Sequence, residues 1–166
     1  MRWSVAKAPG PKRQWWGYPW AVRDVAIEVM EEGLGIPTYA HPADGGCDLV
    51  ATEGHVLAAG GGRGLVPTGI KVALPEGYAG FIQPRSGLAL KHGVTCLNTP
   101  GLIDAGYRGE IKVLLINTDP KESYEIHRGD RIAQLVVQRV EHVSFRQVAS
   151  LDDSTRSADG FGSSGR

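Results

Sequence analysis

The sequence predicts an all-β domain, a sandwich or a barrel with one short helix, and two observations support this fold class. Short apolar runs with the period of a strand recur along the chain at intervals of roughly 8–12 residues. Groups of glycine, proline and aspartate separate these runs, as turns between strands do. With 166 residues, of which 42% are hydrophobic and 22% charged, the chain is long enough to bury one core.

The expected strands begin after residue 23 and follow one another closely. Val25, Ile27 and Val29 alternate with less apolar positions, which is the two-residue period of a half-buried strand. The same alternation appears in residues 70–74. Further short apolar runs lie at residues 81–82, 111–115 and 132–140, and turn-forming groups lie at residues 45–46, 60–62, 75–77 and 128–130.

One helix is expected at Ser86–His92, with Ser86 as the N-cap and Gly93 as the C-terminal stop. The free N–H groups and the positive end of the helix dipole at its start would suit a phosphate. Ser86 adds a hydroxyl, Arg85 adds a charge, and Gly87 permits close approach of the backbone. A plain capped helix with an exposed arginine is the alternative interpretation of this segment taken alone.

Three parts of the chain differ in composition. Residues 1–23 contain all four tryptophans, five cations and no acid, and we interpret them as a disordered extension; an arm that binds a partner or nucleic acid is the alternative. Residues 24–150 form the predicted β domain. Residues 151–166 are rich in serine and glycine and are expected to form a flexible C-terminal arm.

The charge balance argues against a protein that coats nucleic acid. The formal net charge of the chain is zero, and without the five cations of residues 1–23 the remainder has 13 basic and 18 acidic residues, a balance of −5. We therefore expect no stable nucleic-acid binding by the β domain. An anionic ligand would be bound by a few placed groups rather than by the field of the whole protein.

The sequence also bears on the compartment. It has no run of about 18 apolar residues and no apolar signal region, so we expect neither a membrane span nor a secretory signal. Cys47 and Cys96 lie far apart and outside any metal-ligand spacing, and they are expected to be reduced thiols. These features predict a cytoplasmic protein.

The stretch from Asn98 to Ile111 holds three glycines between two apolar flanks, and it is expected to form a β-hairpin with exposed backbone edges. Main-chain N–H and C=O groups on such an edge can match the O2, N3 and O4 pattern of uracil. Asp104 would then stand beside the sugar, with Tyr107 one hairpin step away. A structural aspartate in a turn is the common alternative for this acid.

Two further segments carry weaker signals. Arg131 and Gln134 follow the turn at residues 128–130, and most such polar pairs are merely solvated. The C-terminal arm holds Arg156 and Phe161 in a Gly/Ser-rich context. Such a backbone with its hydroxyls can wrap phosphates, and Phe161 can stack on a base; a disordered tail is the alternative.

Taken together and in order, five segments resemble the five sequence motifs of the trimeric dUTPase family. The PRSGLA string at residues 84–89 and the IDAGYRGEI string at residues 103–111 are the most specific. The resemblance covers about residues 25–166, and the departures are small: GGCDL stands where Ala-Gly is commoner, and Ser157 where glycine is usual. The five segments are residues 45–51, 84–89, 98–111, 128–135 and 156–165.

The resemblance implies a fold, an assembly and a reaction. The fold is a jelly-roll-type β-sandwich that forms a homotrimer with three active sites at the subunit junctions. One subunit gives the first, second and fourth motifs, a neighbour gives the third, and the remaining subunit closes its C-terminal arm over the ligand as a lid. The reaction is Mg²⁺-assisted hydrolysis of dUTP to dUMP and pyrophosphate, which limits uracil incorporation into DNA and supplies dUMP for dTMP synthesis.

The resemblance also implies residue roles around the reacting phosphorus and the nucleoside. Asp104 is similar to the general base, which deprotonates a water for in-line attack on the α-phosphorus, and Tyr107 to the floor under the deoxyribose. Asp48 resembles the motif-one acid that fixes Mg²⁺, through water. Uracil recognition would fall to Asn98, to the backbone of Leu102, Ile103 and Asp104, and to Lys112.

The remaining roles implied by the resemblance concern the phosphate chain and the lid. The phosphates would be held by Arg85, Ser86, Gly87, Arg131 and Gln134. In the arm, Arg156 would contact the γ-phosphate and Phe161 would stack on uracil. Gly162, Ser163 and Ser164 would wrap the phosphate chain.

Two alternatives stand beside this interpretation. A dCTP deaminase-like enzyme shares the fold but attacks the base; the Arg85-Ser86-Gly87 string and the Asp104/Tyr107 pair argue against it, and ammonia release from dCTP would identify it. A non-catalytic dUTPase-like regulatory module belongs to a different functional class. The acid at Asp104 and the arm residues argue against such a module, whereas the Trp-rich extension could still bind a partner.

Overall fold

The computed structural model describes residues 24–152 and confirms the all-β prediction. Within these residues eleven strands accompany a single short helix. The elements are β1 Ala26–Val29, β2 Cys47–Val50, β3 His55–Leu57, β4 Arg63–Pro67, β5 Ile70–Ala73, β6 Tyr78–Gln83, α1 Ser86–His92, β7 Val94–Cys96, β8 Gly101–Ile103, β9 Lys112–Asn117, β10 Tyr124–Ile126 and β11 Arg131–Arg139.

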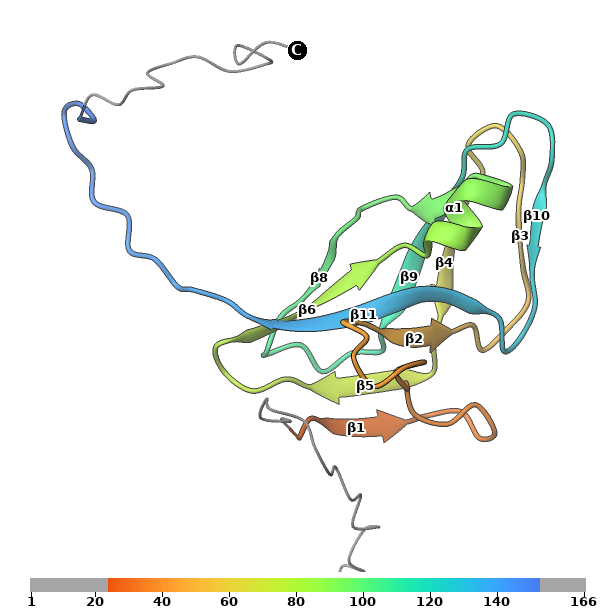
Figure 1. The fold of residues 1–166 in the computed structure, drawn as a ribbon, viewed down its shortest axis with the longest axis horizontal. Helices are drawn as coiled ribbons and strands as arrows, with labels where there is room; N and C mark the ends of the chain where they lie inside the picture. The colour runs from red at the N-terminus through yellow and green to blue at the C-terminus, as the bar shows by residue number, and fades with distance from the viewer. Residues whose placement is uncertain (1–23, 153–166) are drawn as a thin grey trace, which may run out of the picture.

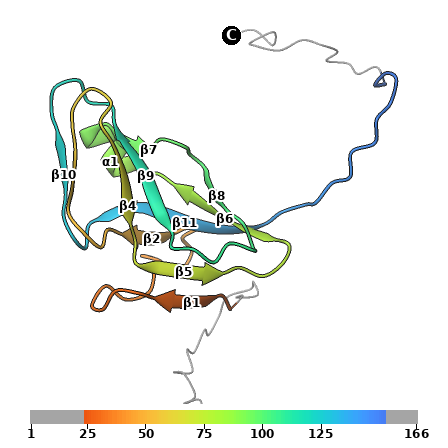
Figure 2. The same cartoon turned by 180° about the vertical axis from the view of Figure 1, so that it is seen from behind.

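The strands form a jelly-roll-like sandwich in which every pairing is antiparallel. One sheet has the order β2-β11-β6-β8, and a second has the order β4-β9-β7. Two ribbons, β1-β5 and β3-β10, complete the structure. β11 is the longest strand and runs between β2 and β6 (Figure 1), while the sheet of β4, β9 and β7 is seen best from behind (Figure 2).

The core lies between the sheets and follows from the alternation of side chains along each strand. In β9, Val113, Leu115 and Asn117 are buried, whereas the residues between them are only partly covered. Asn117 is a polar group inside this core, and its side chain donates to Leu57 O (3.1 Å) and Glu122 O (2.8 Å). Since its amide oxygen also accepts from the Asp119 N–H (2.9 Å), the buried side chain keeps its hydrogen bonds.

The predicted helix is confirmed, but the expected N-cap is wrong. Arg85 is the N-cap, with extended φ −97° and ψ 122° and no side-chain cap bond, and Ser86 is already the first helical residue. The chain enters α1 directly from β6 through Pro84, so the last extended residue is Arg85. Gly93 ends the helix as expected, since its left-handed φ of 64° directs its N–H to Ala89 O and Leu88 O.

The hairpin expected between residues 98 and 111 is also wrong. β8 pairs with β6, whereas β9 pairs with β4 and β7, so the segment crosses from one sheet to the other. The physical reason is Ile111, which is fully buried and donates its N–H to Ile70 O (2.9 Å). Because β8 ends the order of its sheet, the predicted exposed backbone edge is nevertheless present.

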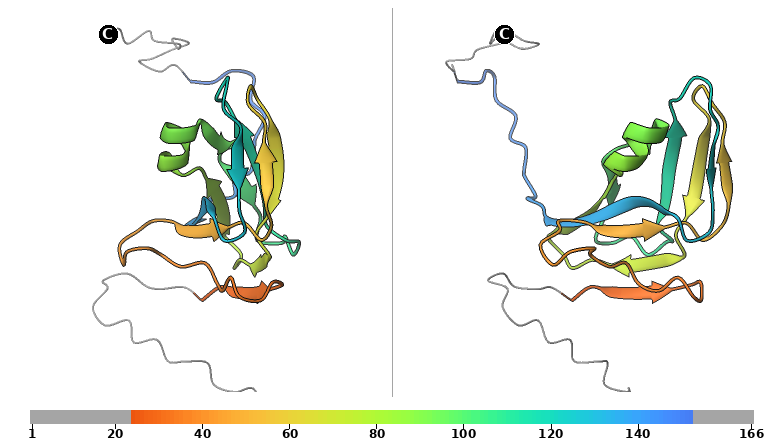
Figure 3. Two further views of the ribbon diagram at one scale, coloured as in Figure 1. Left: turned by 90° about the vertical axis from the view of Figure 1, so that its right-hand side faces the viewer. Right: turned by 45° about the vertical axis from the view of Figure 1, so that its right-hand side comes forward.

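The chain leaves the body of the molecule after β11. Residues 140–152 contain no strand and extend away from the sheets (Figure 3). Apolar side chains on this segment are exposed, among them Val143 (67%), Phe145 (92%) and Leu151 (87%). No helix in the described part of the chain has the length and apolar character needed to cross a membrane.

Candidate active site

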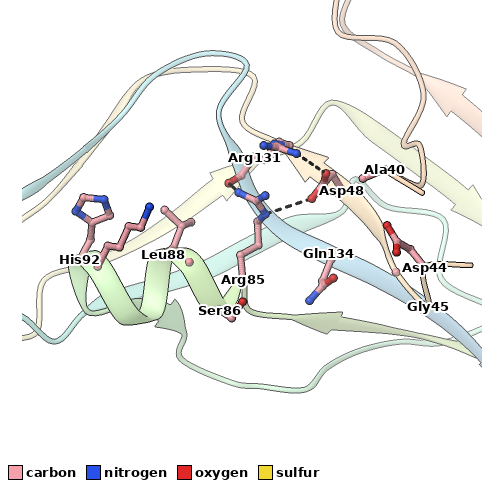
Figure 4. A pocket seen from close by; sticks show the side chains of 13 residues that line it. Ala40, Asp44, Gly45, Asp48, Arg85, Ser86, Leu88, His92, Arg131 and Gln134 are labelled. Carbon is pink, nitrogen blue, oxygen red and sulfur yellow. Dashed lines mark hydrogen bonds and ion pairs between the residues drawn. The ribbon is translucent and has the colours of Figure 1, made fainter. Parts of the chain in front are cut away.

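A first cavity of about 600 Å³ opens between β2, β11 and the junction of β6 with α1 (Figure 4). Its walls contain residues of the first, second and fourth predicted motifs. The register of β11 brings these motifs together, because Gln134 pairs with Asp48 on β2 and with Gln83 on β6. The lining residues are Ala40, Asp44, Gly45, Gly46, Asp48, Arg85, Ser86, Gly87, Leu88, Lys91, His92, Arg131 and Gln134.

Asp48 lies between two arginines in this cavity. Its Oδ1 is 3.2 Å from Arg85 Nε and its Oδ2 is 3.2 Å from Arg131 Nη1. Arg85 Nη1 also donates to the backbone oxygen of Arg131 (3.1 Å). One carboxylate thus orients two guanidinium groups and leaves a surplus of positive charge, which suits a phosphate chain.

Gln134 is also fixed by the fold. Its Nε2 donates to Pro84 O (3.1 Å), which ties β11 to the start of the second motif. Gly46 lies against it, since a Cβ at that position would be 3.0 Å from Gln134 Oε1 and 3.2 Å from Val136 Cγ2. Close packing of the residue before β2 against β11 therefore favours a glycine at this position.

Four residues of this cavity lie outside the five predicted motifs, namely Ala40, Asp44, Lys91 and His92. Lys91 and His92 stand three and four positions after Leu88, so the face of the helix that carries them could have been read from helical spacing. The His92 ring is 4.8 Å from the Tyr124 ring. Asp44 accepts a hydrogen bond from the His41 N–H (2.8 Å). Its position directly before Gly45 and Gly46 is the sequence feature that could have marked it as a site residue.

A second cavity, of about 650 Å³, contains the residues predicted for the base and the sugar. It lies along β8, the following turn and the outer faces of β4 and β9. The predicted residues that it brings together are Asn98, Leu102, Ile103, Asp104, Tyr107 and Lys112. The other lining residues are Met30, Leu65, Lys71, Ile82, Gly101, Glu110 and Leu114.

The turn that carries Asp104 and Tyr107 is held by several hydrogen bonds. The Tyr107 N–H donates to Asp104 O (3.0 Å), and Tyr107 Oη donates to Glu110 O (3.0 Å). Arg108 Nη1 donates to Ala105 O (2.6 Å) and Tyr107 O (2.8 Å). The carboxylate and the phenol are therefore presented on a fixed backbone.

The two cavities have no lining residue in common among the described residues. The structure brings Arg85, Arg131 and Gln134 together with Asp48, but it places Asp104 in the other cavity. A single chain thus presents two separate half-sites. Arg156, Phe161, Gly162, Ser163 and Ser164 lie outside the described residues.

The first cavity offers few oxygen donors to a metal ion such as Mg²⁺. Within residues 24–152 no three His, Cys, Asp or Glu side chains are grouped as a metal cage, and both Asp48 oxygens face guanidinium groups. Mg²⁺ keeps several waters and binds through one or two carboxylates together with substrate phosphates. The carboxylates of Asp48 and Asp44 in this cavity fit such an ion when it arrives with a phosphate chain.

The jelly-roll sandwich and its arginine-lined cavity describe an all-β protein with a cavity suited to a small anionic ligand. Comparison with known protein families identifies the family within this class of fold. The family model described as dUTPase matches residues 33–165, and the chain belongs to the dUTPase family.

Curated relatives and solved structures agree with this assignment. The deoxyuridine 5′-triphosphate nucleotidohydrolase of Thermobifida fusca is 59% identical over 85% of this chain and 78% of its own length, and that of Nocardia farcinica is 57% identical over 87% of each. The Staphylococcus bacteriophage 80alpha dUTPase with dUpNHpp has a TM-score of 0.77 at 28% identity, covering 87% of this chain and all of its own. A mutant dUTPase of phage phi11, with a structural Mg(II) ion, has a TM-score of 0.69 at 25% identity over 77% of this chain and 98% of its own.

Proposed function

We propose that this protein hydrolyses dUTP to dUMP and pyrophosphate, and so limits uracil incorporation into DNA and supplies dUMP for dTMP synthesis. The observation that carries the proposal is the pair of half-sites in a member of the dUTPase family. One has the arginines that a triphosphate requires, and the other has a carboxylate, an aromatic ring and a backbone edge that suit a deoxynucleoside.

The separation of the half-sites supports a homotrimer with shared active sites. A nucleoside triphosphate needs both halves, so the cavity of Arg85 and Arg131 in one subunit would face the cavity of Asp104 in a neighbour. The segment 140–152 leads the chain away from its own sheets and exposes apolar side chains. This course would allow residues 151–166 to close over an active site formed by other subunits.

The chemistry assigned to Asp104 is proton transfer from water. Its carboxylate accepts a proton as the water oxygen attacks the α-phosphorus; the bond from the α-phosphorus to the α,β-bridging oxygen breaks, and pyrophosphate leaves. The alignment of water and phosphorus should supply much of the rate. Mg²⁺, held by the phosphates and by Asp48 through water, would neutralise the charge on the phosphates.

The phosphate contacts are assigned to the first cavity and to the arm. Arg85 and Arg131 supply charge, Ser86 a hydroxyl, Gly87 a backbone N–H, and Gln134 an amide. In the arm, Arg156 is assigned to the γ-phosphate and Phe161 to stacking on uracil. Gly162, Ser163 and Ser164 are assigned to the rest of the phosphate chain.

The nucleoside contacts are assigned to the second cavity. β8 is the last strand of its sheet, so the main chain from Leu102 to Asp104 lies at an edge where it could pair with uracil. Asn98 and Lys112 are its polar neighbours. Cytosine would present the wrong donors and acceptors to such an edge, and unpaired polar groups make this kind of discrimination steep. Tyr107 would lie under the deoxyribose and leave no room for a 2′-hydroxyl.

The proposal also covers the cellular compartment of the protein and its binding to membranes and nucleic acid. We infer a cytoplasmic enzyme whose β domain binds neither a membrane nor nucleic acid stably. Cys47 and Cys96 are both free and buried, which agrees with a reducing compartment. The acidic balance of the chain beyond residue 23 disfavours binding to a polyanion.

The test of the proposed function is pyrophosphate release from dUTP, dCTP, dTTP, dATP, dGTP and UTP, with and without Mg²⁺. The expected result is release from dUTP alone, strongly increased by Mg²⁺, with no ammonia formed from dCTP. Purified Asp104→Asn protein serves as the control for contaminating phosphatases. Release of pyrophosphate from every nucleotide at similar rates would contradict the proposal.

A further inference from the structure

We propose that Gly109 and Glu110 are positioning residues that set the plane of the Tyr107 ring, and thereby the selection of deoxyribose over ribose. The inference rests on the proposed function, because it takes Tyr107 to lie under the sugar. It concerns two residues that contact the tyrosine from the same stretch of backbone, directly after the turn.

Gly109 leaves the space that the phenol ring occupies. A Cβ at this position would overlap Tyr107 Oη and would lie 2.6 Å from Cζ and 3.0 Å from Cε2. Its φ does not lie in the left-handed region, so the backbone there accommodates other residues. The glycine is therefore needed for the ring and not for the turn.

Glu110 holds the same ring by a hydrogen bond, since its backbone oxygen accepts from Tyr107 Oη (3.0 Å). The carbonyl is itself anchored to the body of the protein. The Glu110 carboxylate accepts the Gly69 N–H (2.9 Å) and lies 3.4 Å from Lys112 Nζ, and its side chain is only 17% exposed. The Tyr107 ring is thus held in one position by a hydrogen bond to Glu110, and it packs there against Gly109, which has no side chain.

A methyl group at position 109 would move the ring toward the sugar or turn it aside. To reach an ordinary contact, the distance from Cβ to Cζ must increase from 2.6 Å to at least 3.4 Å. Misplacement by about 1 Å in a positioned site can change rates by roughly a hundredfold, so the ratio of the two sugars should respond strongly.

The experiment compares kcat/KM for dUTP with kcat/KM for UTP in Gly109→Ala and in Gly106→Ala protein. Gly106 is the matched control, because it lies in the turn just before Gly109 and a Cβ there meets nothing within 4 Å. Gly109→Ala should lower the dUTP/UTP ratio about tenfold or more, while Gly106→Ala should leave it unchanged. An unchanged ratio in folded Gly109→Ala protein would overturn the inference.

A double-mutant cycle separates positioning from a general structural effect. In a Tyr107→Ala background, Gly109→Ala should cause no further loss of selectivity, because the ring through which it acts is absent. Additive losses would mean that Gly109 acts by another route and would overturn the inference. Both Glu110→Gln and Glu110→Ala keep the backbone carbonyl, but only Glu110→Gln keeps a side-chain oxygen for the Gly69 N–H. Glu110→Gln should therefore retain more selectivity, and equal losses would count against the role of Glu110.

Failure of the inference can be told apart from failure of the proposed function. If the proposed function is wrong, the unmodified protein itself will not hydrolyse dUTP in preference to UTP. If only the inference is wrong, the unmodified protein will discriminate and Gly109→Ala will discriminate equally well. Thermal unfolding of each variant shows that the comparison is made on folded protein.

Discussion

The Asp48 carboxylate lies 3.2 Å from Arg85 Nε, and its second oxygen lies 3.2 Å from Arg131 Nη1. This relationship links β2, the β6–α1 junction and β11 through a single acidic side chain. It also bears on the assignment of Asp48 to the metal, because both carboxylate oxygens already face cations. Asp48 could orient the two arginines or hold Mg²⁺ through water, and these two roles predict different kinetic behaviour.

Asp48→Asn should raise KM for dUTP about tenfold, because the amide holds the two guanidinium groups less firmly. The unfolding midpoint should change little, since the paired side chains are 21% to 55% exposed and exposed ion pairs contribute about 0–1 kcal/mol. Steady-state kinetics over a range of Mg²⁺ concentrations measures KM and its Mg²⁺ dependence, and thermal unfolding measures the midpoint. Glu31→Gln, which removes a pair with Arg128, is the control; an unchanged KM with lost Mg²⁺ dependence would assign Asp48 to the metal alone.

Asp104→Asn should leave dUTP binding largely intact while turnover falls by about two to four orders of magnitude, the usual range for a general base. The amide has nearly the same shape as the carboxylate but cannot accept the proton from water. Isothermal titration with dUpNHpp reports binding, and single-turnover pyrophosphate release reports the chemical step. Retained turnover in this variant would remove the assignment of Asp104 as the base.

Burial raises the pKa of the Cys96 thiol to about 11 from an ordinary value of 9.0. The folded state therefore retains the thiol proton to higher pH than the unfolded state does, and this contribution to stability is complete below pH 9. It is lost as the pH rises from 9 toward 11. Chemical unfolding between pH 8 and 11 should show a steeper loss of stability for the unmodified protein than for Cys96→Ala, and parallel curves would contradict this account.

Much of the fold was predictable because burial imposes a two-residue period on each strand. Val113 and Leu115 of β9 and Ile70 and Val72 of β5 carry that signal directly. Strand pairing was not predictable, since no local pattern states that Ile111 enters the core beside Ile70. The hairpin interpretation failed for this reason.

The candidate site was predictable where a motif is contiguous in the sequence and not where only the fold creates the contact. Arg85 and Gln134 were identified from their motifs. Helical spacing places Lys91 and His92 on the same face of α1 as Leu88, but only the fold shows that this face lines the cavity. The N-cap was misplaced by one residue because Pro84 and Arg85 continue the extended chain before α1 begins.

Truncation before Arg156 should leave the assembly intact and reduce dUTP hydrolysis by about a hundredfold or more, because a lid that excludes water and completes the site would be absent. Size-exclusion chromatography with light scattering reports the assembly, and pyrophosphate release reports the activity. A shorter truncation that removes only Arg166 is the control. A fully active protein ending before Arg156 would refute the role given to the arm.

Mixing two inactive variants offers the most direct test of the proposed homotrimer with shared active sites. Asp104→Asn chains retain the phosphate half-site and Arg85→Ala chains retain the nucleoside half-site, so an active pair arises only where the two variants meet in the right order around the threefold axis. Random assembly from equal amounts gives this order at about one site in four, so co-expressed protein should recover about a quarter of the unmodified activity. Native mass spectrometry counts the mixed trimers. Mixed trimers without recovered activity would mean that each site is complete within one chain, since in that case every site would still contain a defective half.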